Sequence, residues 1–341
     1  MSKVLLKANI NQHVLSYQDV GDPQNDTIVF IHGFPFDQSI WQQQIDFFKT
    51  KYRVITYDIR GHGSSESGNN TFGLDLFADD LIGLMNHLEI KQAIVCGLSL
   101  GGYILLNAIG RFPERFKSII LNDTKCEEDT IYQKINRLTA IKNLNLLGIE
   151  QYASHSLTSL FTQKNIQNNF HQVNFIKNII LQTSIKTVDK TLVAMAVRKD
   201  TCSELEQIKV PTLIIVGKED ALTPINVAQS MKNRIKDAHL AIIENAAHLP
   251  NLENESDFNA AINHFLTQIS TNHTNSTMIN QKILELTNEI RDKYPELLKY
   301  LNEMPISIPN KENPEVHTDQ LKAYYNQLLE ILNQYKETHE K

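Results

Sequence analysis

The chain has 341 residues, of which 41% are hydrophobic, and its net charge at neutral pH is −6. That length favours one large domain with an appendage, and 33 basic against 39 acidic residues leave no surplus of positive charge for binding nucleic acid. No stretch approaches the roughly 18 apolar residues that a membrane span needs, and the N-terminus lacks the features of a signal peptide.

The three cysteines, Cys96, Cys126 and Cys202, are odd in number and widely separated. This spacing argues against a disulfide framework, and the lack of C-x-x-C and H-E-x-x-H motifs argues against zinc. We therefore predict a cytoplasmic protein with reduced cysteines.

Predicted strands and helices alternate through the first part of the chain. Residues 3–20 form two short runs that predict a hairpin at a sheet edge. The continuous apolar run 27–31 is typical of a strand buried on both faces of a parallel sheet. The alternation predicts a mostly parallel, doubly wound α/β sheet. Further strands are expected at 53–58, 93–96 and 118–122, and helices at 41–48, 74–88 and 102–109.

A glycine-rich loop, residues 60–65, follows the second buried strand. It superficially suggests phosphate binding, but it lacks the Walker lysine and does not fit G-x-G-x-x-G at the start of a helix. We interpret it as a structural loop near the mouth of a site.

The pentapeptide Gly97-Leu98-Ser99-Leu100-Gly101 lies between a predicted strand and a predicted helix. G-x-S-x-G in that context is typical of a nucleophile elbow, in which the serine hydroxyl is held above the sheet. Neighbouring side chains would block so tight a turn, so Gly97 and Gly101 are a steric requirement. Alone the pattern is weak, because short Gly/Ser patterns usually mark turns. The interpretation of Ser99 as a nucleophile therefore requires that the rest of the chain supply a base, an acid that orients the base, and an oxyanion site.

Candidates for these partners follow other predicted strands. After strand 27–31, the backbone N–H of Phe34 can face an oxyanion; the alternative is an ordinary turn in which His32 hydrogen-bonds the loop. Asp220 follows the apolar run 210–217 and can orient a histidine, or it can cap a helix. His248 lies in the loop after the last strand, 239–243.

Residues 125–200 show no comparable buried strand. Helical patterns around 131–147, 152–160 and 170–181 predict a helical cap, as lids over active sites are built. Ten basic and six acidic residues give this segment a net charge of +4. The charge can attract an anionic substrate, or it can reflect scattered solvated lysines. Arg137 and Arg198 are candidate carboxylate anchors, with the surface as the alternative place for each.

The C-terminal part has a different pattern. A closing helix, 258–269, is followed by a polar stretch, 270–278, that predicts a linker. Apolar residues at helical spacing within 279–301 and 321–335 predict a helical hairpin, with Pro305, Pro309 and Pro314 marking its turn. We expect this extension, residues 279–341, to dock on the main domain, or else to self-associate or bind a partner.

The order Ser99, Asp220, His248, each in a loop after a predicted strand, resembles the α/β-hydrolase fold. The resemblance covers about residues 10–268 and is greatest to 3-oxoadipate enol-lactonase-like esterases, including cofactor-free haloperoxidase relatives. Ala247 departs from it, because the family usually has glycine before the histidine. The matching segments are 31–35, 58–65, 97–103, 216–220 and 248–253.

The resemblance implies a role for each matching residue. Ser99 would attack an acyl carbon, His248 would act as general base and acid, and Asp220 would orient His248. The backbone N–H groups of Phe34 and Leu100 would form the oxyanion hole.

Asp123 also follows a strand and is a rival third member of the triad, although the surrounding motif favours Asp220. We expect a core at 1–124 and 201–269, a cap at 125–200, a linker and a helical extension. The expected function is hydrolysis of a small carboxylic ester or lactone through an acyl-enzyme, without a cofactor or metal. The alternatives are carbon–carbon bond hydrolysis or perhydrolysis on the same triad, and a ligand receptor that signals through the C-terminal hairpin.

Overall fold

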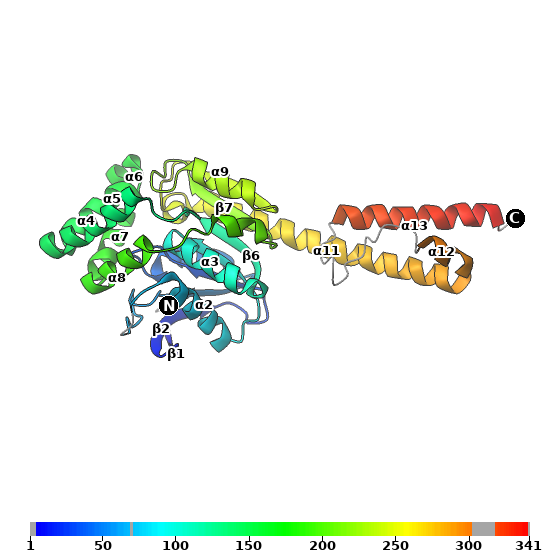
Figure 1. Cartoon of the computed structure of the whole chain (residues 1–341), viewed down its shortest axis with the longest axis horizontal. Helices are drawn as coiled ribbons and strands as arrows, with labels where there is room; N and C mark the ends of the chain where they lie inside the picture. Colours follow the sequence, from blue (N-terminus) through cyan, green and yellow to red (C-terminus); the bar gives the residue numbers. More distant parts are fainter. Residues whose placement is uncertain (1–4, 69–70, 302–317, 340–341) are drawn as a thin grey trace. The chain divides into compact units, whose positions relative to one another are not determined.

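The computed structural model of the protein describes residues 5–68, 71–301 and 318–339 (Figure 1). The chain divides into two compact units, residues 1–262 and residues 263–341. The first unit contains the sheet and its covering helices, and the second is helical. Among the described residues, no helix combines the length and the apolar content needed to cross a bilayer.

A sheet of eight strands, counted over the described residues, forms the centre of the first unit (Figure 1). Its order is β1-β2-β4-β3-β5-β6-β7-β8. β1 and β2 form an antiparallel hairpin at one edge, β2 pairs antiparallel with β4, and the remaining pairs are parallel. The predicted α/β fold is therefore confirmed. The strands are β1 (Leu6–Ile10), β2 (His13–Val20), β3 (Thr27–Ile31), β4 (Arg53–Tyr57), β5 (Ala93–Leu98), β6 (Phe116–Asn122), β7 (Thr212–Gly217) and β8 (Ala238–Ile243).

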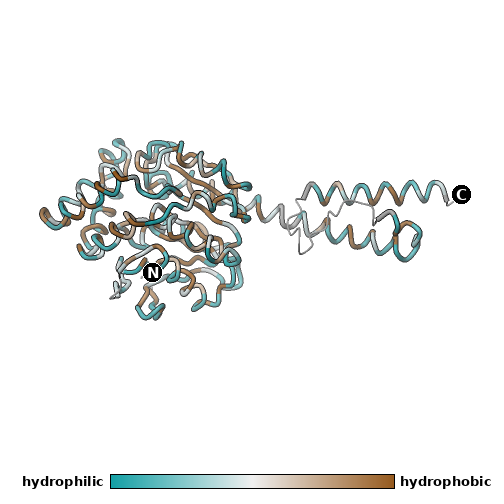
Figure 2. The backbone as a smooth tube through the Cα atoms, viewed as in Figure 1, coloured by the Kyte–Doolittle hydropathy of each residue, from teal (hydrophilic) through white to brown (hydrophobic). Residues whose placement is uncertain are grey.

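Helices between the strands shield the sheet from water. β3 and β5 are buried along their whole length, as continuous apolar strands in a parallel sheet should be. In Figure 2, apolar stretches of the tube gather in the interior of the first unit, and its outer segments are more polar. The helices around the sheet are η1 (Gln38–Trp41), α1 (Gln42–Phe48), α2 (Leu74–His87), α3 (Leu100–Arg111), η2 (Pro113–Arg115), η3 (Cys202–Gln207), α9 (Ile225–Arg234) and α10 (Pro250–Glu253).

The chain between β6 and β7 is helical, as predicted. We call residues 125–200 the cap. Its first helix begins with a capping box, in which Thr130 and Gln133 each bond the other's backbone, and Gly148 separates it from the second helix. The cap helices are α4 (Ile131–Leu147), α5 (Ile149–Leu160), α6 (Gln163–Asn168), α7 (Phe170–Gln182) and α8 (Ile185–Ala196).

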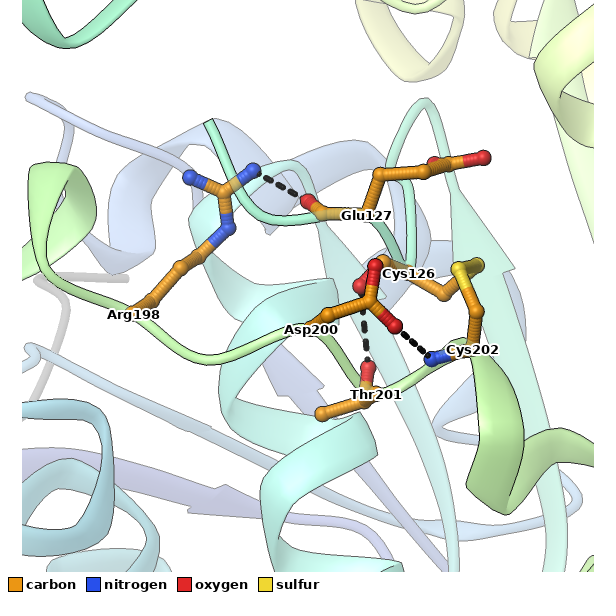
Figure 3. Close-up of a disulfide and its surroundings, with 6 residues drawn as sticks. All are labelled: Cys126, Glu127, Arg198, Asp200, Thr201 and Cys202. Carbon is orange, nitrogen blue, oxygen red and sulfur yellow. Dashed lines mark hydrogen bonds between the residues drawn. A yellow bond between two sulfur atoms is a disulfide. The ribbon is translucent and has the colours of Figure 1, made fainter. Parts of the chain in front are cut away.

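A disulfide joins Cys126 and Cys202, so the prediction of reduced, unpaired cysteines is wrong (Figure 3). The two cysteines are 76 residues apart in sequence, but they come together because the chain leaves and re-enters the core at one place. There Thr201 also donates its N–H and its hydroxyl to the carbonyl of Cys126. Disulfides are typical of oxidising compartments, so this bond weighs against the predicted cytoplasmic location, which stays a prediction.

Removing the disulfide should destabilise the fold without touching the cavity. We expect the double substitution Cys126→Ser, Cys202→Ser to lower the free energy of unfolding by about 4 kcal/mol, because the bond closes a long loop in the unfolded chain. Urea unfolding followed by circular dichroism measures the change. A reducing agent should lower the free energy of unfolding of the native protein to that of the double variant, and it should leave the stability of the double variant unchanged. Equal stability of oxidised and reduced native protein would contradict this prediction.

The second unit is a pair of packed helices. α11 (Glu255–Lys293) begins in the first unit and is continuous through residues 270–278, so the expected linker is helical instead. Ile283, Leu286 and Ile290 of α11 are buried in one cluster with Leu321 and Leu328 of α13 (Thr318–His339). The predicted helices thus pack on each other, while the proline turn lies outside the described residues. Short helices η4 (Pro295–Leu297) and α12 (Leu298–Leu301) follow α11.

Candidate active site

Ser99 occupies the tight turn between β5 and α3. Its φ is +52°, in the left-handed region that non-glycine residues rarely adopt, and its N–H donates to the carbonyl of Asn122 at 2.9 Å. A Cβ atom on Gly97 would lie 2.3 Å from the carbonyl oxygen of Gly101, and one on Gly101 would lie 2.4 Å from that of Ile31. The predicted steric need for both glycines is confirmed, and strain of this kind is typical of functional sites.

His248 and Asp220 lie in loops at the carboxyl ends of β8 and β7. His248 Nδ1 is 2.8 Å from Asp220 Oδ2, and both side chains are buried. Asp220 also accepts from the N–H of Leu222 at 2.7 Å and the hydroxyl of Thr223 at 2.5 Å. Burial alone would raise the pKa of Asp220, but the charge of His248 and these hydrogen bonds outweigh it and hold the pKa below its usual value. An ionised Asp220 fixes a proton on Nδ1 and leaves Nε2 as the basic nitrogen.

Asp123, the rival acid, lies beside this pair but does not bond the histidine nitrogen that Asp220 occupies. Its Oδ1 accepts from the N–H of Gly217 at 2.9 Å. Burial and, secondarily, the charge of Asp220 raise the pKa of Asp123 well above its usual value, so its surroundings favour the neutral carboxyl. Asp123, Asp220 and His248 place potential metal-ligand atoms within 4.8 Å of one another, but the hydrogen bond between Asp220 and His248 already uses two of them.

Ser99 and His248 both line a cavity of about 310 Å³ beneath the cap. Phe34, the predicted oxyanion donor, lines it too. Leu100 is the first residue of α3, where a helix leaves backbone N–H groups without intrahelical partners. Other cavity residues come from the 34–35 loop, α3, the cap and the 222–223 loop: Pro35, Tyr103, Lys125, Asp129, Gln133, Asn136, Arg137, Ala140, Tyr152, Ser156, Ser159, Leu160, Leu192, Met195, Leu222 and Thr223.

Three cations surround one carboxylate in the cavity wall. Asp129 pairs with Arg137, with Arg198 at 2.7 Å and with Lys125 at 3.5 Å. Burial opposes ionisation of Asp129, but the two arginines lower its pKa to about 2. Arg198 is buried, and its guanidinium carbon lies 4.2 Å from the ring centre of Tyr103. The alternative prediction, that Arg198 is a surface residue, is therefore wrong. Arg137 is also largely buried. Lys125, Asp129 and Arg137 line the cavity, whereas Arg198 adjoins it through its ion pair with Asp129. With all four groups ionised, this cluster carries a net charge of +2.

Two contributors to the site, Glu253 and Lys125, were given no role from the sequence, although Glu253 ends the matching segment 248–253. Glu253 Oε1 accepts from the N–H of Thr162 in the cap at 2.7 Å, and Oε2 accepts from the N–H of Ala247 at 2.6 Å. The N–H of His248 itself donates to the carbonyl of Leu160 at 3.2 Å. These bonds tie the histidine loop to the cap. Lys125, the other contributor, lies in the cavity wall.

The remaining candidates have structural roles. His32 Nε2 accepts from the N–H of Ile59 at 2.9 Å, and its Nδ1 donates to the carbonyl of Gly33 at 2.7 Å. The prediction that His32 hydrogen-bonds the loop is therefore confirmed. Residues 60–65 do not line the cavity; Asp58 holds their loop by accepting from the N–H of Ser64 at 2.8 Å.

Comparisons with known proteins agree with this architecture. A family model for the α/β hydrolase fold matches residues 26–255. 3-Oxoadipate enol-lactonase 2 of Acinetobacter baylyi is 31% identical over 248 residues, covering 73% of this chain and 91% of that protein. A putative non-heme chloroperoxidase of Synechocystis is 29% identical, covering 73% of this chain and 94% of its own.

Solved structures give the same result. A thermophilic esterase from Thermogutta terrifontis superposes with a TM-score of 0.74 at 28% identity, covering 78% of this chain and 99% of that one. The enol-lactonase of Burkholderia xenovorans gives a TM-score of 0.72 at 25% identity, covering 77% and 100%. The family resemblance stated from the sequence is confirmed, and the chain belongs to the α/β-hydrolase fold family.

Proposed function

We propose that the protein is a serine hydrolase that cleaves a carboxylic ester or lactone of a small molecule through an acyl-enzyme. The observation that carries the proposal is Ser99 on its strained turn, opening into the same cavity as a histidine whose Nδ1 is held by a buried carboxylate. The enol-lactonases and the esterase among its relatives support the same class of reaction.

Each residue takes one role in the proposed reaction. His248 Nε2 accepts the proton of Ser99 as the serine oxygen attacks the carbonyl carbon, and ionised Asp220 stabilises the imidazolium that forms. The N–H groups of Phe34 and Leu100 stabilise the oxyanion. His248 then protonates the leaving alkoxide, which departs as the alcohol and leaves acylated Ser99. Water, deprotonated by His248, hydrolyses that acyl group and restores the free serine; in a lactone, the alcohol and acid belong to one product.

The charge of the cavity wall supports a substrate that carries its own carboxylate. Lys125 and Arg137 line the cavity and Arg198 adjoins it through Asp129, so three positive charges meet a single negative charge. An anionic group in the cavity would therefore complete the pairing, and in a partly buried site such a pair is less screened than at the surface. We propose that the cap selects anionic esters or lactones over neutral ones of the same size.

Lys125→Met tests this selectivity. We expect kcat/KM to fall about tenfold for the mono-p-nitrophenyl ester of succinate, because the lost attraction is of the order of 1.4 kcal/mol. The value for p-nitrophenyl butyrate, which has no carboxylate, should change little. Lys164→Met removes the same charge from an exposed position of the cap and should leave both values unchanged. An equal loss on both substrates in Lys125→Met would contradict anion selectivity.

Steady-state turnover of short p-nitrophenyl esters and of simple lactones tests the proposed function itself. We expect multiple turnovers that stop once one equivalent of an organophosphonate has reacted. Turnover only of substrates with a hydrolysable carbon–carbon bond, or hydrogen-peroxide-dependent turnover alone, would favour the second enzymatic reading. A single slow turnover per molecule would favour a ligand receptor.

A further inference from the structure

Exposed apolar side chains concentrate on the cap. Of the seventeen large hydrophobic side chains that are exposed among the described residues, ten lie within residues 125–200. Six of the ten are on one helix, α4: Ile131, Tyr132, Ile135, Leu138, Leu146 and Leu147. A soluble surface rarely gathers apolar side chains in this way unless something binds there.

Four of these residues form a stripe along α4. Ile131 is 79% exposed, Ile135 53%, Leu138 58% and Leu146 69%, and their spacing of four, three and eight residues places them on one side of the helix. Helix α8 packs against α4, and its Val193 side chain is 45% exposed. We call Ile131, Ile135, Leu138 and Leu146 the apolar stripe; along α4 in Figure 2, apolar and polar positions alternate.

The charge around the stripe is positive. A hydrogen bond from Asn145 to Asp189 joins α4 and α8. Besides Arg137, which faces the cavity, the two helices contain four lysines, Lys134, Lys142, Lys186 and Lys190, against one acidic residue, Asp189. Lys134 pairs with Glu128, which precedes α4. Lys142 lies within the stripe and is exposed. The cap carries a net charge of +4 in a chain of −6, so the rest of the chain carries −10. A helix with an apolar side and flanking cations is suited to the interface of an anionic bilayer.

A second copy of the chain fits this face less well. In a two-fold symmetric contact the same patch meets itself, so the cations of α4 and α8 would oppose their own copies at a cost in binding energy. An anionic lipid surface satisfies both the apolar stripe and the cations.

We propose that the apolar stripe of α4 docks the protein on an anionic phospholipid surface. On its other side α4 contributes Gln133, Asn136 and Ala140 to the catalytic cavity. Docking through α4 therefore brings the cavity next to the membrane, where amphiphilic esters concentrate. This binding is independent of the proposed hydrolysis and does not require it.

Vesicle flotation of the full chain tests the proposal, with vesicles of phosphatidylglycerol mixed with phosphatidylcholine and vesicles of phosphatidylcholine alone. We expect the native protein to bind the anionic vesicles and to be released as salt increases. The triple substitution Ile131→Ser, Ile135→Ser, Leu138→Ser should weaken binding at least about tenfold, since it removes three apolar side chains from the contact. A matched control, Phe47→Ser, Met278→Ser, Leu284→Ser, changes side chains that are 48%, 54% and 60% exposed elsewhere and should bind as the native protein does.

Three results would overturn the proposal. The first is no binding to the anionic vesicles, and the second is equal binding by the two triple variants. The third is native self-association in analytical ultracentrifugation that the α4 triple variant abolishes, because a second copy would then cover the stripe. Thermal unfolding by circular dichroism establishes that both triple variants are folded, as expected for substitutions of exposed side chains.

Discussion

Replacing Ser99 with alanine is expected to lower kcat for hydrolysis of p-nitrophenyl butyrate by about 10⁶-fold, the scale of loss when the nucleophile of a serine hydrolase is removed. The substitution deletes the attacking oxygen alone and leaves the pair of His248 and Asp220 in place. Alanine differs from serine only in lacking the hydroxyl, so the cavity keeps its shape and KM should change little. Stopped-flow release of p-nitrophenolate measures the effect.

Ser159→Ala is the matched control for this prediction. Ser159 also lines the cavity, but its hydroxyl donates to the carbonyl of Ser156 at 2.9 Å. Its loss should change kcat by less than about tenfold, since one neutral hydrogen bond contributes about 1 kcal/mol. If Ser99→Ala retained activity within that same range, another group would be the nucleophile and the proposed mechanism would be wrong.

The second large effect distinguishes the two buried carboxyl groups. Asp220→Asn should lower kcat about 10⁴-fold, because an amide neither stabilises the imidazolium of His248 nor maintains the required tautomer. Asp123→Asn should lower kcat less than about tenfold. Burial raises the pKa of the Asp123 carboxyl and so favours its neutral form, and a neutral amide of the same shape can accept from the N–H of Gly217 in its place.

Kinetics of both variants on one ester, with circular dichroism to confirm folding, complete this comparison. The reverse order, with Asp123→Asn inactive and Asp220→Asn nearly native, would assign the orienting role to Asp123. Equal losses in the two variants would show that the carboxyl groups act as one unit, contrary to the separate roles proposed here.

The structural features that depend on residues close together in the sequence could be predicted. The turn at Ser99 follows from local sterics, because Gly97 and Gly101 must lack a Cβ atom wherever the chain makes that turn. The buried strands follow from continuous apolar runs, which the parallel sheet places at its centre. Since loops after parallel strands open at one sheet edge, the proximity of Asp220 and His248 could also be predicted.

Contacts between distant segments could not be predicted in this way. The disulfide depends on where the cap returns to the core, which no local pattern around Cys126 or Cys202 records. Arg198 bonds Asp129, which lies 69 residues away in the sequence, so the sequence around Arg198 gave no reason to place it beside a carboxylate of the cavity wall. The helix through residues 270–278 was missed for another reason: Ser, Thr and Asn are weak helix formers, and their propensity is a small term that context overrides.

Identification of the residue that carries the acyl group tests the central claim most directly. The protein is mixed with excess p-nitrophenyl butyrate, quenched in acid within the first turnover, digested and analysed by mass spectrometry. We expect a butyryl group on the peptide that contains Ser99 in the native protein, and none in Ser99→Ala. An acyl group on a different residue, or ester turnover with no acylated Ser99 at any quench time, would contradict it.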